Sequence, residues 1–325
     1  MNTLQQHIKQ KEFSKLYLLY GEEDYLKKRY KDSLQVAIIS DDLTMNYSYF
    51  EGKNIDVIEV IEKAETLPFF NDRRLIIIEN SDLFLVQNSL ADRLNTLPKS
   101  THIIFVEKKV DKRSKLYKQI KKNGTITELN ELDNKKLKVF VASLLKKDNK
   151  KVTENTVSYL LDKTGTNMLY IQNEVEKLIC YAYDRDLITK EDIDSVCTEQ
   201  IEGKIFQMID AIVVKNKDTA LKLYYDLLEL KEKPMSILFL LSRHFKILLQ
   251  VKDLSKLGRD KYTIAGKVGV SPYFVGKYIG QSNKFSVDSL KDNLYLCNQA
   301  EEDVKTGRQN DQLGVEVLII QFANN

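Results

Sequence analysis

The fold of this chain can be worked out from residues 65–78, which have the sequence ETLPFFNDRRLIII. Pro68 has no N–H group to donate and disfavours the helical conformation of Leu67, so the amphipathic segment before it should end here. The successive aliphatic residues 75–78 then predict a strand. The stretch is therefore the end of a helix, a short connection and the start of a strand.

The connection contains two adjacent aromatic residues, Phe69 and Phe70. Short connections between helices and strands usually lie on the protein surface. Two neighbouring aromatic side chains in a tight turn cannot easily both point inward, so we expect at least one to be exposed. An exposed apolar patch on an otherwise charged chain suggests a binding surface for a partner. The alternative is that both rings fill the core of their own domain.

The alternation of helix and strand extends through the first third of the chain. Short apolar runs are typical of strands, and the segments between them have helical patterns, one of them capped by Asn54. The five predicted strands are residues 16–20, 46–50, 75–78, 101–106 and 125–129. Strands separated by helices need crossover connections, which favours a parallel sheet with helices on both faces. We predict a three-layer α/β domain over about residues 1–133.

Beyond residue 133 the strand signals stop, and the rest of the chain is predicted to be helical. Short helical patterns joined by brief polar links indicate a small helical domain at residues 134–201, in which Thr153 and Thr189 resemble capped helix starts. From residue 202 the helices lengthen, and Pro234 begins a long one. We therefore expect a further all-α domain at residues 202–325.

The composition is that of a folded globular protein, because 43% of the residues are hydrophobic and 30% are charged. A chain of 325 residues is long enough for two or three domains. The formal net charge of +3 neither requires nor excludes nucleic acid. The N-terminus lacks a secretion-signal pattern, and there is no long apolar run, so we expect neither export nor a membrane span.

Cysteine and histidine usage favours a reducing, cytoplasmic compartment and argues against a metal site. The cysteines are Cys180, Cys197 and Cys297. An odd number of widely spaced cysteines argues against a disulfide framework. No histidine lies near a cysteine in the sequence, which gives no support to a zinc site.

The turn after the first strand is where a nucleotide-binding α/β domain carries its phosphate loop, G-x-x-x-x-G-K-[S/T]. Residues 21–28 here read GEEDYLKK. Leu26 replaces the second glycine and removes its conformational freedom, and Lys28 replaces the hydroxyl that would hold Mg²⁺. The carboxylates of residues 22–24 would repel a polyphosphate, at about 1–4 kcal/mol per close like-charged pair near a surface. We find no ATPase site, and the sequence has no G-x-S-x-G or H-E-x-x-H motif.

Three other segments have features of DNA contacts. Residues 263–278 have the rhythm of a helix-turn-helix, but Lys277 is nearly alone as a base-reading side chain, which favours packing within the all-α domain. The basic run 107–115 could approach phosphates, although such runs usually form solvated faces. Residues 301–308 read as a helix end closed by Gly307, or as a loop that touches DNA.

Three segments together resemble the delta subunits of bacterial DNA polymerase III. They are residues 17–26 (YLLYGEEDYL), residues 67–70 (LPFF) followed by two arginines and an aliphatic strand, and residues 300–307 (AEEDVKTG). The similarity spans essentially the whole chain, and the segments occur in the order found in that family. Each motif alone is moderately specific, and the combination is persuasive.

The resemblance implies a clamp-loader subunit with an AAA+-type α/β first domain, a small helical lid domain and a C-terminal helical collar domain. It implies that the subunit needs no cofactor, because ATP is bound and hydrolysed by partner subunits. Members of the family bind one protomer of the ring-shaped sliding clamp, the beta subunit, through a hydrophobic wedge. By position, the clamp-binding residues here are Leu67, Pro68, Phe69 and Phe70.

The implied partners are the clamp, the gamma or tau subunits and the delta prime subunit in a hetero-pentamer, with primed DNA inside the assembled complex and no membrane. The implied function is to bind and open the clamp for loading during chromosomal replication, as a non-catalytic subunit of a DNA-directed DNA polymerase (nucleotidyltransferase) holoenzyme. One alternative is an AAA+-type ATPase of DNA replication or repair with an atypical nucleotide site. Another is a transcription regulator that uses residues 263–278.

Overall fold

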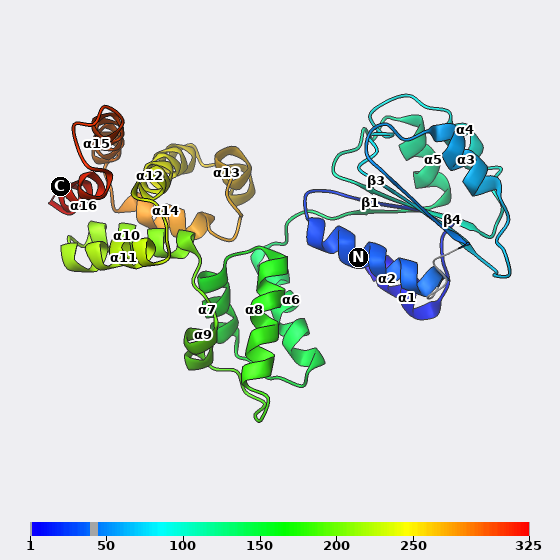
Figure 1. Ribbon diagram of the computed structural model, residues 1–325, viewed down its shortest axis with the longest axis horizontal. Coiled ribbons are helices and arrows are strands. Elements are labelled where there is room, and N and C mark those ends of the chain that lie inside the picture. Colours follow the sequence, from blue (N-terminus) through cyan, green and yellow to red (C-terminus); the bar gives the residue numbers. More distant parts are fainter. Residues whose placement is uncertain (1, 40–44, 325) are drawn as a thin grey trace. The chain divides into compact units, whose positions relative to one another are not determined.

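The computed structural model of the chain describes residues 2–39 and 45–324. The chain divides into two compact units, Met1–Glu131 and Leu132–Asn325 (Figure 1). The five-stranded sheet lies in the first unit, and the second unit is built mainly from helices.

The first unit alternates helices and strands along the sequence. Its elements are α1 (Asn2–Gln10), β1 (Leu16–Tyr20), α2 (Asp24–Ile39), β2 (Tyr47–Glu51), α3 (Val57–Glu65), β3 (Arg74–Glu79), α4 (Leu90–Arg93), β4 (Thr101–Glu107), α5 (Lys115–Asn123) and β5 (Thr125–Glu128). All the strands expected from the sequence are present, with small shifts at their ends. The α/β fold class is confirmed.

The five strands form one parallel sheet in the order β2-β3-β4-β1-β5. β4 is thus inserted between β1 and β3. In a parallel sheet, all strands start at one edge and end at the opposite edge. The turn after β1 and the connection before β3 therefore lie at opposite edges of the sheet.

Helices cover both faces of the sheet because its central strands are apolar on both sides. Every residue of β1 and β4 is buried. Alternate residues such as Leu18 and Phe105 pack with side chains of α3, α4 and α5 in one core. α1 and α2 lie on the opposite face (Figure 1). This is the predicted three-layer arrangement.

Two local features of this unit differ from expectation. α3 is capped by Asp56 and not by Asn54, because the Asp56 carboxylate accepts a hydrogen bond of 2.8 Å from the N–H of Ile58. Both residue types cap helices well, so local sequence did not decide between them. α1 was not expected. It is stabilised by tertiary packing, since Leu4 is fully buried and α1 contacts α2.

The second unit consists of helices joined by short links. They are α6 (Asn134–Lys147), α7 (Glu154–Thr164), α8 (Met168–Tyr181), α9 (Lys190–Val196), α10 (Ile201–Val213), α11 (Lys217–Glu229), α12 (Pro234–Lys256), α13 (Lys261–Val268), α14 (Val275–Asn283), α15 (Val287–Lys305) and α16 (Asp311–Asn324). Side chains of α10 to α16 share one hydrophobic core. The division at residue 201 into a lid and a collar domain stays a prediction.

The helix starts predicted for this unit are present. Thr153 and Thr189 are N-caps, and Thr189 forms a reciprocal capping box with Asp192. Pro234 is in the first turn of α12, where its missing N–H is not needed. The three cysteines are free thiols. Among the described residues, no helix has the length and apolar character needed to cross a membrane.

Candidate functional site

The connection between α3 and β3 carries the residues singled out in the sequence. The hydroxyl and the N–H of Thr66 both donate to the carbonyl of Glu62, at 2.7 and 3.2 Å, and close the end of α3. Thr66 itself is extended, and Pro68 prevents the helix from continuing. β3 starts at Arg74, so residues 67–70, which we call the wedge loop, lie at the edge where the strands begin.

The apolar side chains of the wedge loop face solvent. Leu67 is 67% exposed, Phe69 is 54% exposed and Phe70 is 93% exposed. The two phenyl rings form an edge-to-face pair with 4.4 Å between their centroids and an interplanar angle of 77°. The alternative in which both rings fill the core of their own domain is therefore wrong.

The backbone of the wedge loop is held in an unusual conformation. Phe70 has φ of 48°, in the left-handed region that bulky residues rarely adopt. Such a residue costs about 1–3 kcal/mol and persists only where the surrounding structure fixes it. The neighbouring Phe69 is fixed by Asn46, whose side-chain oxygen accepts from the Phe69 N–H at 2.6 Å and whose Nδ2 donates to the Phe69 carbonyl at 2.8 Å.

The contact of Asn46 with the wedge loop was not predicted. Asn46 falls within the predicted second strand, whereas β2 begins one position later, at Tyr47. No local pattern links Asn46 to Phe69, because the two are 23 residues apart and meet only when β2 pairs with β3. The only hint of this contact in the local sequence is the position of Asn46, an asparagine at the start of a predicted strand of aromatic and polar residues.

At the opposite edge of the sheet, the turn after β1 uses its backbone groups within the fold. The Gly21 N–H donates to the carbonyl of Glu107 at 3.2 Å, and the Glu23 N–H donates to that of Leu129 at 3.0 Å. In a phosphate loop these amides would face the ligand. Gly21 has φ of 130°, and a Cβ atom there would lie 2.3 Å from the Leu129 carbonyl oxygen. This glycine permits close contact between two parts of the chain.

Carboxylates occupy the rest of that turn. The Glu23 carboxylate accepts a hydrogen bond of 3.1 Å from the N–H of Tyr25 at the start of α2, and burial raises the pKa of this carboxyl. Lys27 has the position of the phosphate-loop lysine, but it is buried and lies 2.8 Å from the carboxylate of Asp24. Negative charge thus stands where a polyphosphate would bind, and the lysine already has a partner.

The segment that resembles a helix-turn-helix packs against α7. It consists of α13, a left-handed Gly269 with φ of 71°, and α14. The Tyr273 hydroxyl donates to the carboxylate of Asp162 at 2.9 Å, and Lys277 lies 2.8 Å from the same carboxylate. These candidate base-reading side chains are therefore engaged with α7, as the packing interpretation requires.

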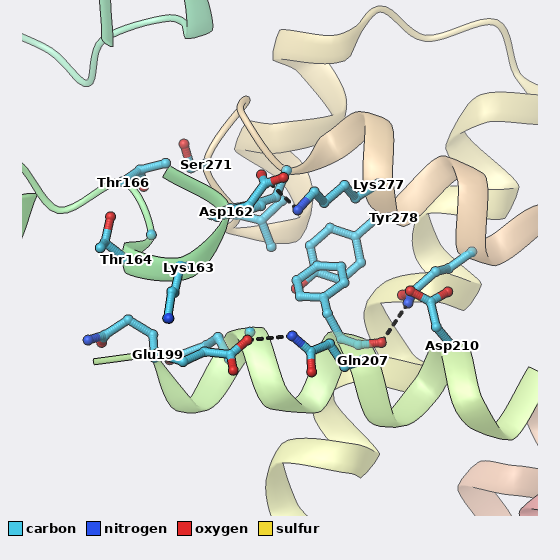
Figure 2. Close-up of a pocket in the computed structure, with 18 of the residues that line it drawn as sticks. Asp162, Lys163, Thr164, Thr166, Glu199, Gln207, Asp210, Ser271, Lys277 and Tyr278 are labelled. Carbon is cyan, nitrogen blue, oxygen red and sulfur yellow. Dashed lines mark hydrogen bonds and ion pairs between the residues drawn. The ribbon is translucent and has the colours of Figure 1, made fainter. Parts of the chain in front are cut away.

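A cavity of 780 Å³ lies beside this contact and is lined by residues of α7, α9, α10, α12, α14 and the links next to them (Figure 2). Its lysines are paired with its carboxylates. The pairs are Lys163 with Asp194 at 2.8 Å, Lys277 with Asp162 at 2.8 Å and Lys284 with Asp210 at 3.2 Å. Because each of these lysines is neutralised, they give no basis for an anion site in the cavity.

The two charged segments that could approach DNA also contain local ion pairs. In the first segment the pairs are Lys108–Glu22, Lys112–Glu128, Arg113–Asp111 and Lys115–Asp92. In the second they are Lys305–Glu301, Arg308–Glu302 and Arg308–Asp303. Gly307 follows the end of α15 with φ of 73°, as expected of a helix terminus. The helix-end interpretation of the second segment is supported.

Comparison with known proteins gives consistent matches along the chain. The family described as DNA polymerase III, delta subunit, matches residues 17–130, and the family of the C-terminal domain of these delta subunits matches residues 202–322. DNA polymerase III subunit delta of Bacillus subtilis is 27% identical, over 97% of this chain and 94% of that protein. The probable subunit delta of Aquifex aeolicus is 24% identical, over 90% of this chain and 82% of that protein.

A solved structure also matches over the full length. The clamp loader delta protein of Bacillus subtilis aligns with a TM-score of 0.80 and 26% identity, covering 100% of this chain and 99% of that one. The fold and these likenesses define a replication protein of the clamp-loader class. The chain belongs to the DNA polymerase III delta subunit family, as the sequence motifs indicated.

Proposed function

We propose that this protein is the clamp-loader delta subunit that binds one protomer of the sliding clamp through the wedge loop. The observation that carries the proposal is the 93% exposure of Phe70 on a loop tied to the edge of the sheet. Burial of a large, solvent-exposed aromatic side chain by a partner is favourable, because it removes apolar surface from water. An exposed apolar patch of this kind commonly marks a protein-binding surface.

The residues of the wedge loop have different parts in this proposal. Phe70 is the most exposed and is the anchor that enters an apolar pocket of the clamp. Phe69 packs edge-to-face against it and limits its movement. Leu67 and Pro68 shape the turn and add apolar area. Burying an aromatic anchor at an interface is typically worth about 2–4 kcal/mol.

The wedge opens the clamp only if it binds the open ring more tightly than the closed ring. A ligand shifts a conformational equilibrium by its differential affinity for the two states, and each tenfold preference is worth about 1.4 kcal/mol. No covalent chemistry is needed for this step. The subunit therefore acts by binding, without a cofactor of its own and without intrinsic enzymatic activity.

In the assembly we propose, ATP is bound and hydrolysed by the gamma or tau subunits, and their nucleotide state controls whether the wedge is presented. Residues 202–325 act as the collar that joins these subunits and delta prime, and residues 134–201 act as the lid. Primed DNA enters the assembled complex in the cytoplasm. The pairing of Lys27 with Asp24 supports the assignment of ATP to the partner subunits.

The proposal is tested by measuring clamp binding of the purified chain and of the double variant Phe69→Ala, Phe70→Ala. We expect a loss of about 3 kcal/mol or more, a hundredfold or greater fall in affinity. A matched control is Leu85→Ala, Val86→Ala, which removes two other exposed apolar side chains of the first unit. This control should bind the clamp as the unchanged chain does.

Circular dichroism of each variant verifies that its fold is intact. Unchanged clamp binding by a folded Phe69→Ala, Phe70→Ala variant would place the contact elsewhere and reject the wedge loop. An equal loss in the control variant would also reject it, because the effect would then follow any loss of exposed apolar area.

A further inference from the structure

We infer that Asn46 is a positioning residue that presents the wedge loop in its binding conformation before any partner arrives. This inference rests on the proposed function for its consequence in clamp binding, whereas its structural part concerns the free chain. Asn46 itself is fully buried, so its side chain cannot touch a partner. It acts through the backbone of Phe69.

Two hydrogen bonds join the Asn46 side chain to the backbone of Phe69, and we call this pair of contacts the Asn46 grip. The Asn46 side-chain oxygen accepts from the Phe69 N–H at 2.6 Å, and its Nδ2 donates to the Phe69 carbonyl at 2.8 Å. A primary amide can accept and donate at the same time, which fixes both the position and the rotation of the Phe69 peptide groups. An ionised aspartate of the same size could accept but not donate.

Asn46 is itself anchored to the sheet. Its carbonyl accepts from the Leu75 N–H at 2.8 Å and extends the pairing of β2 with β3 by one residue. The preceding residue, Met45, accepts a hydrogen bond of 3.2 Å from the guanidinium of Arg74. The grip therefore transmits the rigidity of the sheet edge to the middle of the wedge loop.

Other contacts hold the two ends of the connection. The Thr101 hydroxyl donates to the carbonyl of Ala64 at 2.9 Å, which ties the end of α3 to the start of β4. On the other side, the guanidinium of Arg73 stacks over the ring of Phe13 at 4.8 Å. Between these points, the Asn46 side chain contacts the backbone of the aromatic pair directly, at Phe69.

This arrangement explains how Phe70 stays in a left-handed conformation while its ring is exposed. Strained backbone persists where neighbouring contacts determine it, and the residue just before Phe70 is held on both sides of its backbone. A loop that is ordered in the free protein loses less conformational entropy on binding, so its affinity is higher. Without the grip, we expect Phe70 to relax toward ordinary backbone conformations and the aromatic pair to separate.

The test uses the absence of tryptophan from the sequence. Phe70→Trp places a single indole at the tip of the wedge loop, and its time-resolved anisotropy reports the local motion of the loop in the clamp-free chain. The same reporter is placed in chains that also carry Asn46→Ala or Asn46→Asp. We expect a larger fast component of the anisotropy decay in both, with the greater change in Asn46→Ala.

The matched control is Asn88→Ala with the same reporter. The Asn88 side chain also donates to backbone carbonyls of its own loop, those of Leu83 at 2.7 Å and Val86 at 3.1 Å, and accepts from the Leu90 N–H at 3.2 Å. It belongs to the same unit but lies after β3, at the other edge of the sheet. Its loss should leave the anisotropy decay of the indole at position 70 unchanged.

A second readout is clamp affinity in chains that retain Phe70. We expect Asn46→Ala to weaken binding by about tenfold or more, because two hydrogen bonds that order the bound conformation are gone. The unfolding transition shows whether the fold survives. If Asn46→Ala does not fold, Asn46→Asp carries the test, since it keeps the size of the side chain and its acceptor.

An unchanged anisotropy decay in a folded Asn46 variant would overturn the inference. A loosened loop with undiminished clamp affinity would overturn the consequence for binding. If the loop loosens but the unchanged chain binds no clamp, the positioning of the loop by Asn46 stands and the proposed function fails. The two ideas are thereby separated.

Discussion

The ammonium group of Lys27 lies 2.8 Å from the carboxylate of Asp24, within the first turns of α2. The pair occupies the place where a phosphate-loop lysine would reach a nucleotide. Since Lys27 is buried, releasing it for a ligand would leave Asp24 without its cation and expose the ligand to the nearby carboxylates.

We therefore expect the purified chain to bind Mg²⁺-ATP with a Kd above about 1 mM. The variant Leu26→Gly, Lys28→Thr restores the residue types of the phosphate-loop motif. It should bind no better, because the carboxylates of residues 22–24 remain and the backbone amides of the turn are still hydrogen-bonded within the fold. Equilibrium binding of a fluorescent ATP analogue measures both. Micromolar binding by the unchanged chain would favour the alternative of an ATPase with an atypical site.

The single variants of the wedge loop should differ from each other. Phe70→Ala removes the more exposed ring and is expected to weaken clamp binding by about 2–4 kcal/mol, whereas Phe69→Ala removes its support and should cost less. Binding of each purified variant to surface-immobilised clamp gives the two affinities. A larger effect at Phe69 would make that ring the deeper anchor and reverse the assignment.

The contact of Asp162 with Tyr273 should contribute to the stability of the second unit. Asp162→Ala leaves the largely buried Tyr273 hydroxyl and the Lys277 ammonium without this partner, and we expect the free energy of unfolding to fall by about 1–3 kcal/mol. Urea unfolding measures the change. Asp186→Ala is the control, because the pair of Asp186 with Lys151 is exposed and should be worth about 0–1 kcal/mol. Equal effects would contradict the prediction.

Stability should depend on pH through His244. Its Nε2 lies 2.7 Å from Oε1 of Gln281, and burial lowers the pKa of the imidazole to about 4. In the unfolded chain the pKa is about 6.5, so between these values the unfolded state binds a proton that the folded state does not. The contribution to stability is therefore complete above pH 6.5 and is lost as the pH falls toward 4, by about 3 kcal/mol.

His244→Gln removes this titration and should flatten the pH profile of the free energy of unfolding in that window. A smaller slope should remain from His102, because burial lowers its pKa as well. Denaturant unfolding at several pH values between 4 and 7.5 gives both profiles. Identical slopes in the unchanged chain and the variant would contradict the assignment to His244.

Much of the fold could be predicted because its signals are local. The apolar run of β1, the Pro68 stop after α3 and the capped start of α9 at Thr189 each depend on residues within a few positions of one another. The broken phosphate loop was also readable, since the motif has fixed spacing. The exposure of Phe69 or Phe70 followed from two adjacent aromatics in a short connection.

Other features required partners that are distant in the sequence. The contact between Tyr273 and Asp162 joins residues 111 positions apart, and no periodicity connects them. Helix α1 is short and depends on packing against α2, which local propensity does not encode. The choice of Asp56 over Asn54 as the cap of α3 was likewise not set by residue type, since both residues cap helices well.

The sequence by itself determined the strands, the helices other than α1, the loss of the nucleotide motif and the presence of an aromatic pair at a turn, because residue type and spacing act over short distances. Only the tertiary structure decided how that pair is displayed. Pairing of β2 with β3 brings the Asn46 amide onto the backbone of Phe69, and Phe70 is held outward with φ of 48° as a result. Chain topology sets which distant groups meet, and a buried amide that both donates and accepts then fixes the geometry.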